Sequence, residues 1–227
     1  MSIWTRISDA LQALAAGEGL SAVFEKLVTP PDKTVGFAIA VIALGAKMAK
    51  ADGLVTKDEV TAFREVFHIA RNDEANAAKV FDLARRDVAG YDTYARQIKR
   101  LFGDDQPVLE DLMEGLFHIA IADGEYHPNE NEFLKNVSEI FGIGERCFRS
   151  MRNRFVPDAA PDPYDVLGLP DNASYDEAKV AWRRLVRETH PDQMVARGVP
   201  EEAVKLAQTR MIAINRAWED ITKTHVV

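Results

Sequence analysis

The sequence has a single cysteine, Cys147, so no disulfide can form within the chain. A chain of 227 residues without disulfides is typical of a reducing compartment, and we expect a cytoplasmic protein. Cys147 lies among Ile143, Phe148 and Met151, which predicts a core or half-buried position. No neighbouring residue would lower its pKa, so we do not expect a reactive thiol.

An excess of positive charge is also lacking. The 36 aspartates and glutamates outnumber the 28 lysines and arginines, and the formal net charge is −8. Binding along a nucleic-acid backbone is driven by clustered cations, so we expect no nucleic-acid partner. A local basic face can still bind an acidic protein.

No apolar run is long enough to cross a membrane. The most apolar stretch, VGFAIAVIALGAKMAK at 35–50, is interrupted by Lys47, whereas a bilayer requires about 20 apolar residues. Because this stretch is apolar on all sides, it predicts a buried central helix. The first residues lack a long apolar run and carry Asp9 and Glu18, so we expect no secretory signal. A helix over 3–15 has an apolar stripe without a cationic cluster, which favours packing against the rest of the protein over membrane contact.

Strand signals are nearly absent, since the sequence has few β-branched runs and no hairpin dipeptides between alternating stretches. Apolar residues recur instead at helical spacing, which predicts an all-α fold. We expect helices near 3–15, 20–28, 35–51, 57–70, 73–87, 91–101, 106–122, 128–141, 144–155, 164–168, 175–189 and 200–222.

One boundary is marked by proline. The segment VPDAAPDP at 156–163 contains three prolines in eight residues and is too polar for a core, so it predicts a linker. We therefore divide the chain into an N-terminal helical segment, an all-helical body, a linker and a small helical module. Their residues are 1–29, 30–155, 156–161 and 162–227.

The body contains an internal repeat. AKADGLVTKDE at 49–59 and AIADGEYHPNE at 120–130 share Ala-Asp-Gly and a glutamate seven positions after the aspartate. The repeat predicts two helix–loop–helix halves, each preceded by a buried apolar helix, at 35–48 and 108–121.

Each repeated loop has two interpretations. In the first, Gly53 and Gly124 end a helix with left-handed backbone, and the glutamate caps the next helix. The second is suggested by the aspartate before the glycine, which faces the negative end of the helix dipole, where a cation is preferred. Carboxylate oxygens suit Ca²⁺ or Mg²⁺, although the spacing is not that of an EF-hand. The candidate cation ligands are Asp52, Glu59, Asp123 and Glu130.

The paired Ala-Asp-Gly…Glu loops between apolar helices resemble the TerB domain of tellurite-resistance-type proteins, over about residues 30–155. That family is all-helical and is associated with metal binding through acidic residues. The resemblance therefore implies a helical body with a possible divalent cation.

The module contains the stretch RETHPDQMVARG at 187–198. Ser174 and Glu177 predict a capping box for the helix that leads into it, and Pro191 forces that helix to end. Lys179, Arg183 and Arg187 form a basic stripe on this helix, running toward His190. With the next amphipathic helix, which opens at Pro200, it predicts an antiparallel hairpin joined by a mobile loop.

His190 and Asp192 in that loop have several interpretations. Catalysis is disfavoured because no serine or cysteine lies in a nucleophile turn, and metal binding because further ligands are lacking. Two alternatives stay open on spacing alone. In the first, Asp192 caps the loop and His190 is merely exposed. In the second, the rigid proline displays both side chains to a protein partner.

PYDVLGLPDNAS, AKVAWRRLVRETHPD and INRAWEDI together resemble a DnaJ-type J-domain across residues 162–222. This resemblance implies docking on a DnaK-type chaperone ATPase and stimulation of its ATP hydrolysis, with no catalysis by this chain itself. The implied partner-binding residues are His190, Pro191, Asp192, Lys179, Arg183, Arg184 and Arg187.

The combination with a TerB-like body resembles the DjlA branch of J-domain proteins. Proteins of that branch usually begin with a membrane-spanning helix, and we expect this chain to lack that anchor. The position after Asp192 is Gln193, where the family often has lysine. Neither a Gly/Phe-rich segment nor CxxCxGxG repeats are present, so we expect a body that targets or regulates the module, for a client that the sequence does not name. The alternative is a metal-binding stress-response protein in which the J-like module is an adaptor.

Overall fold

A computed structural model describes residues 7, 33–51, 75, 78, 90–103, 105–122, 124–156, 162–201 and 205–225. Within these residues the fold is all-α, as predicted, and contains no strand. The helices are α3 (Lys33–Ala51), α6 (Tyr91–Phe102), α7 (Gln106–Ala120), α8 (Pro128–Phe141), α9 (Glu145–Phe155), α10 (Pro163–Val166), α11 (Tyr175–Glu188), α12 (Pro191–Ala196) and α13 (Lys205–His225).

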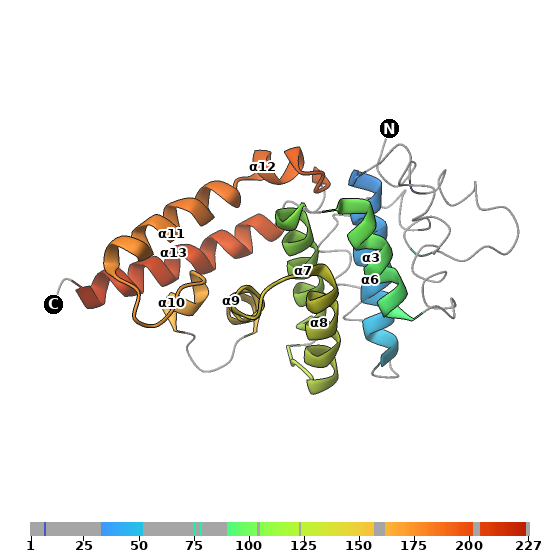
Figure 1. Ribbon diagram of the computed structural model, residues 1–227, viewed down its shortest axis with the longest axis horizontal. Helices are drawn as coiled ribbons and strands as arrows, with labels where there is room; N and C mark the ends of the chain where they lie inside the picture. Colours follow the sequence, from blue (N-terminus) through green and yellow to red (C-terminus); the bar gives the residue numbers. More distant parts are fainter. Residues whose placement is uncertain are drawn as a thin grey trace, which may run out of the picture.

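The centre of the body is α3, which packs against α6, α7 and α8 (Figure 1). Every residue from Val35 to Met48 is buried, including Lys47, whose ammonium lies over the ring of Tyr94 at 5.3 Å. The prediction of a buried central helix is thus confirmed, because an all-apolar surface is stable only when neighbours cover every side.

The second copy of the repeat joins α7 to α8. Gly124 has a φ of 87°, the left-handed backbone that the sequence predicts there. It does not end the helix as predicted, because α7 already ends at Ala120 with Ile121 as its C-cap. Pro128 occupies the first turn of α8, and Glu130 Oε2 accepts a hydrogen bond from the backbone N–H of His127 at 2.9 Å. The capping interpretation of this loop is therefore confirmed for Glu130.

The C-terminal module is a hairpin of α11 and α13, closed at one side by α10 (Figure 1). The rings of Trp182 and Trp218 stack with centroids 5.1 Å apart, and Trp182 Nε1 donates to Asn215 Oδ1 at 2.9 Å. The predicted capping box at the start of α11 is present, since Ser174 N and Glu177 N each donate to the other residue's side chain. A small separate core fills the hairpin, made of Val166, Leu167, Ala178, Ala181, Ile214, Ala217 and Ile221.

Between α11 and α13 the prediction of a mobile loop is wrong. The chain forms the short helix α12 at Pro191–Ala196. Pro191 lacks an N–H and has a fixed φ, so it suits the first helical position, and His190 acts as the N-cap. The same proline that ends α11 therefore begins α12.

The described helices otherwise agree with the predicted ones to within a few residues. The largest difference is the start of α13 at Lys205, where we expected residue 200. The predicted helices at 3–15, 20–28, 57–70 and 73–87 lie outside the described residues, except that residues 7, 75 and 78 are helical. Ile7 is fully buried in the main core, consistent with packing of that apolar stripe against the body.

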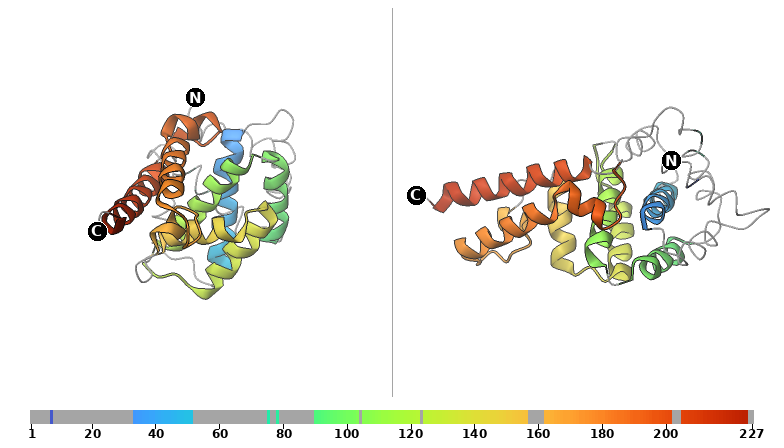
Figure 2. Two further views of the ribbon diagram at one scale, coloured as in Figure 1. Left: turned by 60° about the vertical axis from the view of Figure 1, so that its left-hand side comes forward. Right: turned by 90° about the horizontal axis from the view of Figure 1, so that it is seen from above.

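The module rests on the body through α9, which contacts α10 and α13 (Figure 2). Ser150 Oγ donates to the Val166 backbone oxygen at 2.9 Å, and Arg149 pairs with Asp165 at 2.8 Å. Four module residues also belong to the main core of the body: Met194, Val199, Leu206 and Ala207. Body and module thus share buried apolar surface in addition to polar contacts.

Candidate partner-binding site

The tripeptide His190-Pro191-Asp192 lies at the junction of α11 and α12. Nδ1 of His190 accepts a hydrogen bond from the backbone N–H of Asp192 at 3.2 Å. With Nδ1 used as an acceptor, a neutral imidazole carries its proton on Nε2, which is then free to donate to another molecule. The Asp192 carboxylate lies 3.7 Å from the same Nδ1.

Both polar side chains of the tripeptide are open to solvent. The exposed fraction is 58% for the His190 side chain and 87% for that of Asp192. Within the described part of the chain, neither is covered by the body. The loop therefore presents an N–H donor and a carboxylate acceptor side by side on a rigid proline turn.

The predicted basic helix is α11. Arg183, Arg184 and Arg187 are exposed, and Lys179 is half-buried. No described carboxylate forms an ion pair with any of the four, so their charge is available to an approaching acidic surface. The structure therefore places the predicted stripe and the tripeptide in one continuous region.

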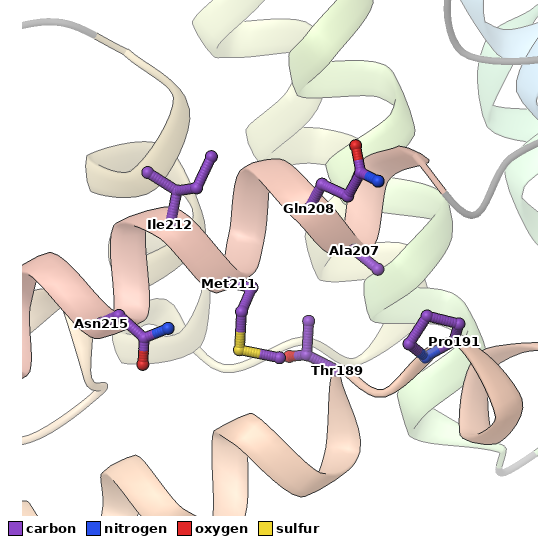
Figure 3. Close-up of a pocket in the computed structure, with 7 residues that line it drawn as sticks. All are labelled: Thr189, Pro191, Ala207, Gln208, Met211, Ile212 and Asn215. Atoms are coloured by element: carbon purple, nitrogen blue, oxygen red, sulfur yellow. The ribbon is translucent and has the colours of Figure 1, made fainter.

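A mostly apolar groove of about 420 Å³ adjoins the tripeptide. Its lining comes from the end of α11, the start of α12 and one face of α13, and consists of Thr189, Pro191, Ala207, Gln208, Met211, Ile212 and Asn215 (Figure 3). Ile212 is 69% exposed, so this apolar side chain of the lining is open to solvent. Thr189 is fully buried, and its hydroxyl has no hydrogen-bond partner within the described residues. This groove adds apolar contact area beside the charged groups.

Two family models match this chain. The DnaJ domain matches residues 162–225, which contain the hairpin, the basic helix and the tripeptide. Tellurite resistance protein TerB matches residues 38–153, which contain most of α3, all of α6 to α8 and most of α9. The chain belongs to the DjlA-like J-domain proteins. From here on, we call the module the J-domain and the body the TerB domain.

Curated relatives align with this chain over most of their length. The co-chaperone protein DjlA of Photobacterium profundum is 24% identical, over 96% of this chain and 88% of the relative. That of Coxiella burnetii is 29% identical, over 78% and 73%, and that of Haemophilus ducreyi is 25% identical, over 92% and 85%. No solved structure matches this J-domain protein. Among the described helices, none is both long and apolar enough to span a bilayer.

The candidate cation site of the TerB domain is only partly described. Asp52, Glu59 and Asp123 lie outside the described residues, and Glu130 is buried at the start of α8, where it caps the helix. The described residues contain no group of three or more potential metal ligands. Cation binding by the TerB domain stays a prediction.

Cys147 is half-buried, as the sequence predicts. Burial raises the pKa of its thiol to about 12, and the nearby charge of Glu110 acts in the same direction. Burial also raises the pKa of Glu110, whose carboxyl is hydrogen-bonded to this thiol. A thiol with so high a pKa is not nucleophilic at neutral pH.

Sequence reasoning missed one group of charged residues, which lies where the J-domain meets the TerB domain. It consists of Asp111, Glu114, Arg154, Arg197 and Arg210, and we name it the interdomain ion cluster. A signal was available, since Asp111 and Glu114 stand three residues apart on α7, among buried positions that otherwise hold only apolar residues and glycine. Carboxylates on a buried helix face require cationic partners from elsewhere in the fold.

Proposed function

We propose that this protein is a co-chaperone whose J-domain docks on a DnaK-type chaperone ATPase and stimulates its ATP hydrolysis. The observation that carries the proposal is the exposed His190-Pro191-Asp192 turn at the end of the exposed basic helix α11. The relatives named as co-chaperones support it, as does the match to the DnaJ domain.

In this function the basic helix, the tripeptide turn and the groove have different roles. The exposed guanidinium groups of α11 attract an acidic surface of the ATPase over several ångströms and orient the encounter. The imidazole Nε2–H and the carboxylate of the turn then form short-range hydrogen bonds and ion pairs that depend on geometry. The groove beside Pro191 contributes apolar contact to the same partner.

The chain itself supplies no catalytic group in this function, because the nucleotide and the reacting bond belong to the partner. We further propose that the TerB domain targets or regulates the J-domain for a client still to be identified. We propose that the protein acts in the cytoplasm, because a chain with a single cysteine is typical of a reducing compartment.

The test is single-turnover ATP hydrolysis by a bacterial DnaK-type chaperone with and without the full chain. We expect wild-type protein to accelerate hydrolysis and His190→Gln to abolish the acceleration, since glutamine cannot reproduce the ring geometry of the turn. His225→Gln is the matched control, because His225 is exposed at the far end of α13 and stacks only on Tyr175. Equal acceleration by wild type and His190→Gln would show that the tripeptide is not the stimulating element.

A second arm addresses the basic helix. Replacing Arg183 and Arg187 by glutamine should raise the concentration needed for half-maximal stimulation and weaken its dependence on salt, because steering by exposed charges is screened by ions. If the variant and the wild type have the same half-saturating concentration at both 50 mM and 200 mM salt, α11 is not part of the interface.

A further inference from the structure

A single side chain closes the segment that contains the tripeptide. Arg197 follows α12, and its Nη1 donates to the backbone oxygen of Glu188, the last residue of α11, at 3.1 Å. Residues 188–197 therefore form a loop tied at both ends. The same guanidinium donates from Nε and Nη2 to Oδ2 of Asp111, at 3.2 and 2.8 Å.

Asp111 belongs to α7 of the TerB domain and has no exposed surface. Its other oxygen, Oδ1, accepts from Arg210 Nη2 at 2.6 Å. Arg210 also pairs with Glu114, which in turn pairs with Arg154 at 2.7 Å. Because both oxygens of Asp111 are held by charged donors, its carboxylate cannot rotate away from Arg197.

Apolar contacts hold the same loop from the same side. Met194 of α12 and Val199 beyond it are buried in the main core of the TerB domain. Gly198 has a φ of 100°, and a Cβ added there would lie 2.8 Å from Cβ of Lys33 in α3. One side of the loop thus lies against the TerB domain, while the His190 and Asp192 side chains remain exposed.

We infer that Asp111 is a positioning residue: through Arg197, the TerB domain holds the His190-Pro191-Asp192 turn in the conformation that the chaperone partner binds. This inference rests on the proposed function. Ordering a free loop costs conformational entropy at the moment of binding, so a loop ordered in advance binds more tightly. The TerB domain thereby contributes to docking without touching the partner.

The exposed fractions argue against the opposite arrangement, in which the TerB domain would hide the turn. A masked turn would have its polar side chains covered, whereas 87% of the Asp192 side chain is exposed. The described contacts support the loop from behind and leave its partner-facing groups free.

The test uses the full chain with Arg197→Gln, Asp111→Asn and both changes together. Arg197→Gln leaves Asp111 paired with Arg210, and Asp111→Asn leaves Arg210 paired with Glu114 and Arg197 bonded to the Glu188 backbone oxygen. Arg149→Gln is the matched control. It removes the ion pair between Arg149 and Asp165, which also joins the two domains but does not involve the loop.

Two readouts are measured for each variant. The first is the concentration of protein that gives half-maximal stimulation of the DnaK-type ATPase, together with the maximal rate. The second is backbone amide hydrogen exchange of residues 190–199, which does not depend on any partner. We expect Arg197→Gln and Asp111→Asn each to raise the half-saturating concentration about three- to tenfold at an unchanged maximal rate. We also expect exchange to accelerate in the loop and not in α11.

The double variant should be no worse than Asp111→Asn alone, because Asp111→Asn already removes the charged contact with Arg197. Additive effects, equal effects of Arg149→Gln, or stimulation stronger than that of wild type would each overturn the inference. If wild-type protein fails to stimulate, the proposed function fails. The exchange data then decide the positioning on their own, with unchanged loop exchange in Arg197→Gln as the contradicting result.

Discussion

Arg210 of the J-domain and Asp111 of the TerB domain form a buried ion pair, with 2.6 Å between Nη2 and Oδ1. The exposed fractions of the two side chains are 8% and 0%. Burial tends to lower the pKa of Arg210, but the carboxylates of Glu114 and Asp111 outweigh this effect and hold the pKa above its ordinary value. The guanidinium therefore stays charged and joins the two domains.

Replacing Arg210 by methionine should lower the free energy of unfolding by about 3–5 kcal/mol, because Asp111 and Glu114 each lose a cationic partner in a buried site. Urea denaturation followed by circular dichroism measures the change. The control is Lys223→Gln, which removes an exposed pair with Asp220 and should change stability by less than about 1 kcal/mol. Similar small losses in both variants would contradict a structural role for the buried cluster.

The turn after α12 requires glycine for two independent reasons. Gly198→Ala would introduce left-handed strain of about 1–2 kcal/mol and a further loss of about 1–3 kcal/mol from contact with Lys33. Gly142→Ala separates the two effects, because Gly142 is also left-handed, with a φ of 74°, but only the Lys99 ammonium lies within 4 Å of the added Cβ. Thermal unfolding should show a clearly larger loss for Gly198→Ala, and equal losses would mean that α3 and the loop are not in contact.

Cys147 should react slowly with thiol reagents in the native protein. Its pKa of about 12 leaves very little thiolate at pH 8, so we expect modification to be about 100-fold or more slower than in the unfolded chain. The rate of reaction with a chromogenic disulfide, measured with and without guanidinium chloride, tests this. Glu110→Gln should speed the native reaction by removing a negative charge beside the sulfur, and equal rates in native and unfolded wild type would contradict the burial.

A divalent cation in the TerB domain remains a prediction from Asp52, Glu59, Asp123 and Glu130. Titration calorimetry with Ca²⁺ and with Mg²⁺ tests it, and binding should disappear when Asp52 and Asp123 are both replaced by asparagine. Undiminished binding in that variant would exclude these aspartates as ligands. A cation that also alters ATPase stimulation would favour the alternative of a metal-responsive protein.

Local patterns in the sequence predicted much of this fold. The all-apolar stretch at 35–50 became the buried helix α3, and Ser174 with Glu177 formed the expected capping box. Gly124 adopted the left-handed backbone expected of a glycine at that place in the repeat. These features follow from interactions between residues a few positions apart, so a single sequence contains the information they require.

The prediction of a mobile loop after α11 failed because the helix that forms there depends partly on a contact with a distant part of the chain. The position of Pro191 after a helical pattern predicts the end of one helix, but proline equally suits the first residue of another, which is where the structure has it. Met194, four residues after the N-cap His190, is buried in the TerB domain and helps hold α12 in place. That contact involves a distant part of the chain, which local spacing does not reveal.

The sequence by itself determined which groups the site displays: a basic helix, a rigid proline, and an imidazole beside a carboxylate, all within residues 179–192. Only the tertiary structure decided how that turn is held. Asp111 and Arg197 are 86 residues apart, and their contact exists because α7 and the end of α12 pack together. Pairing of buried charges depends on which surfaces meet in the folded chain, and no local pattern encodes that choice.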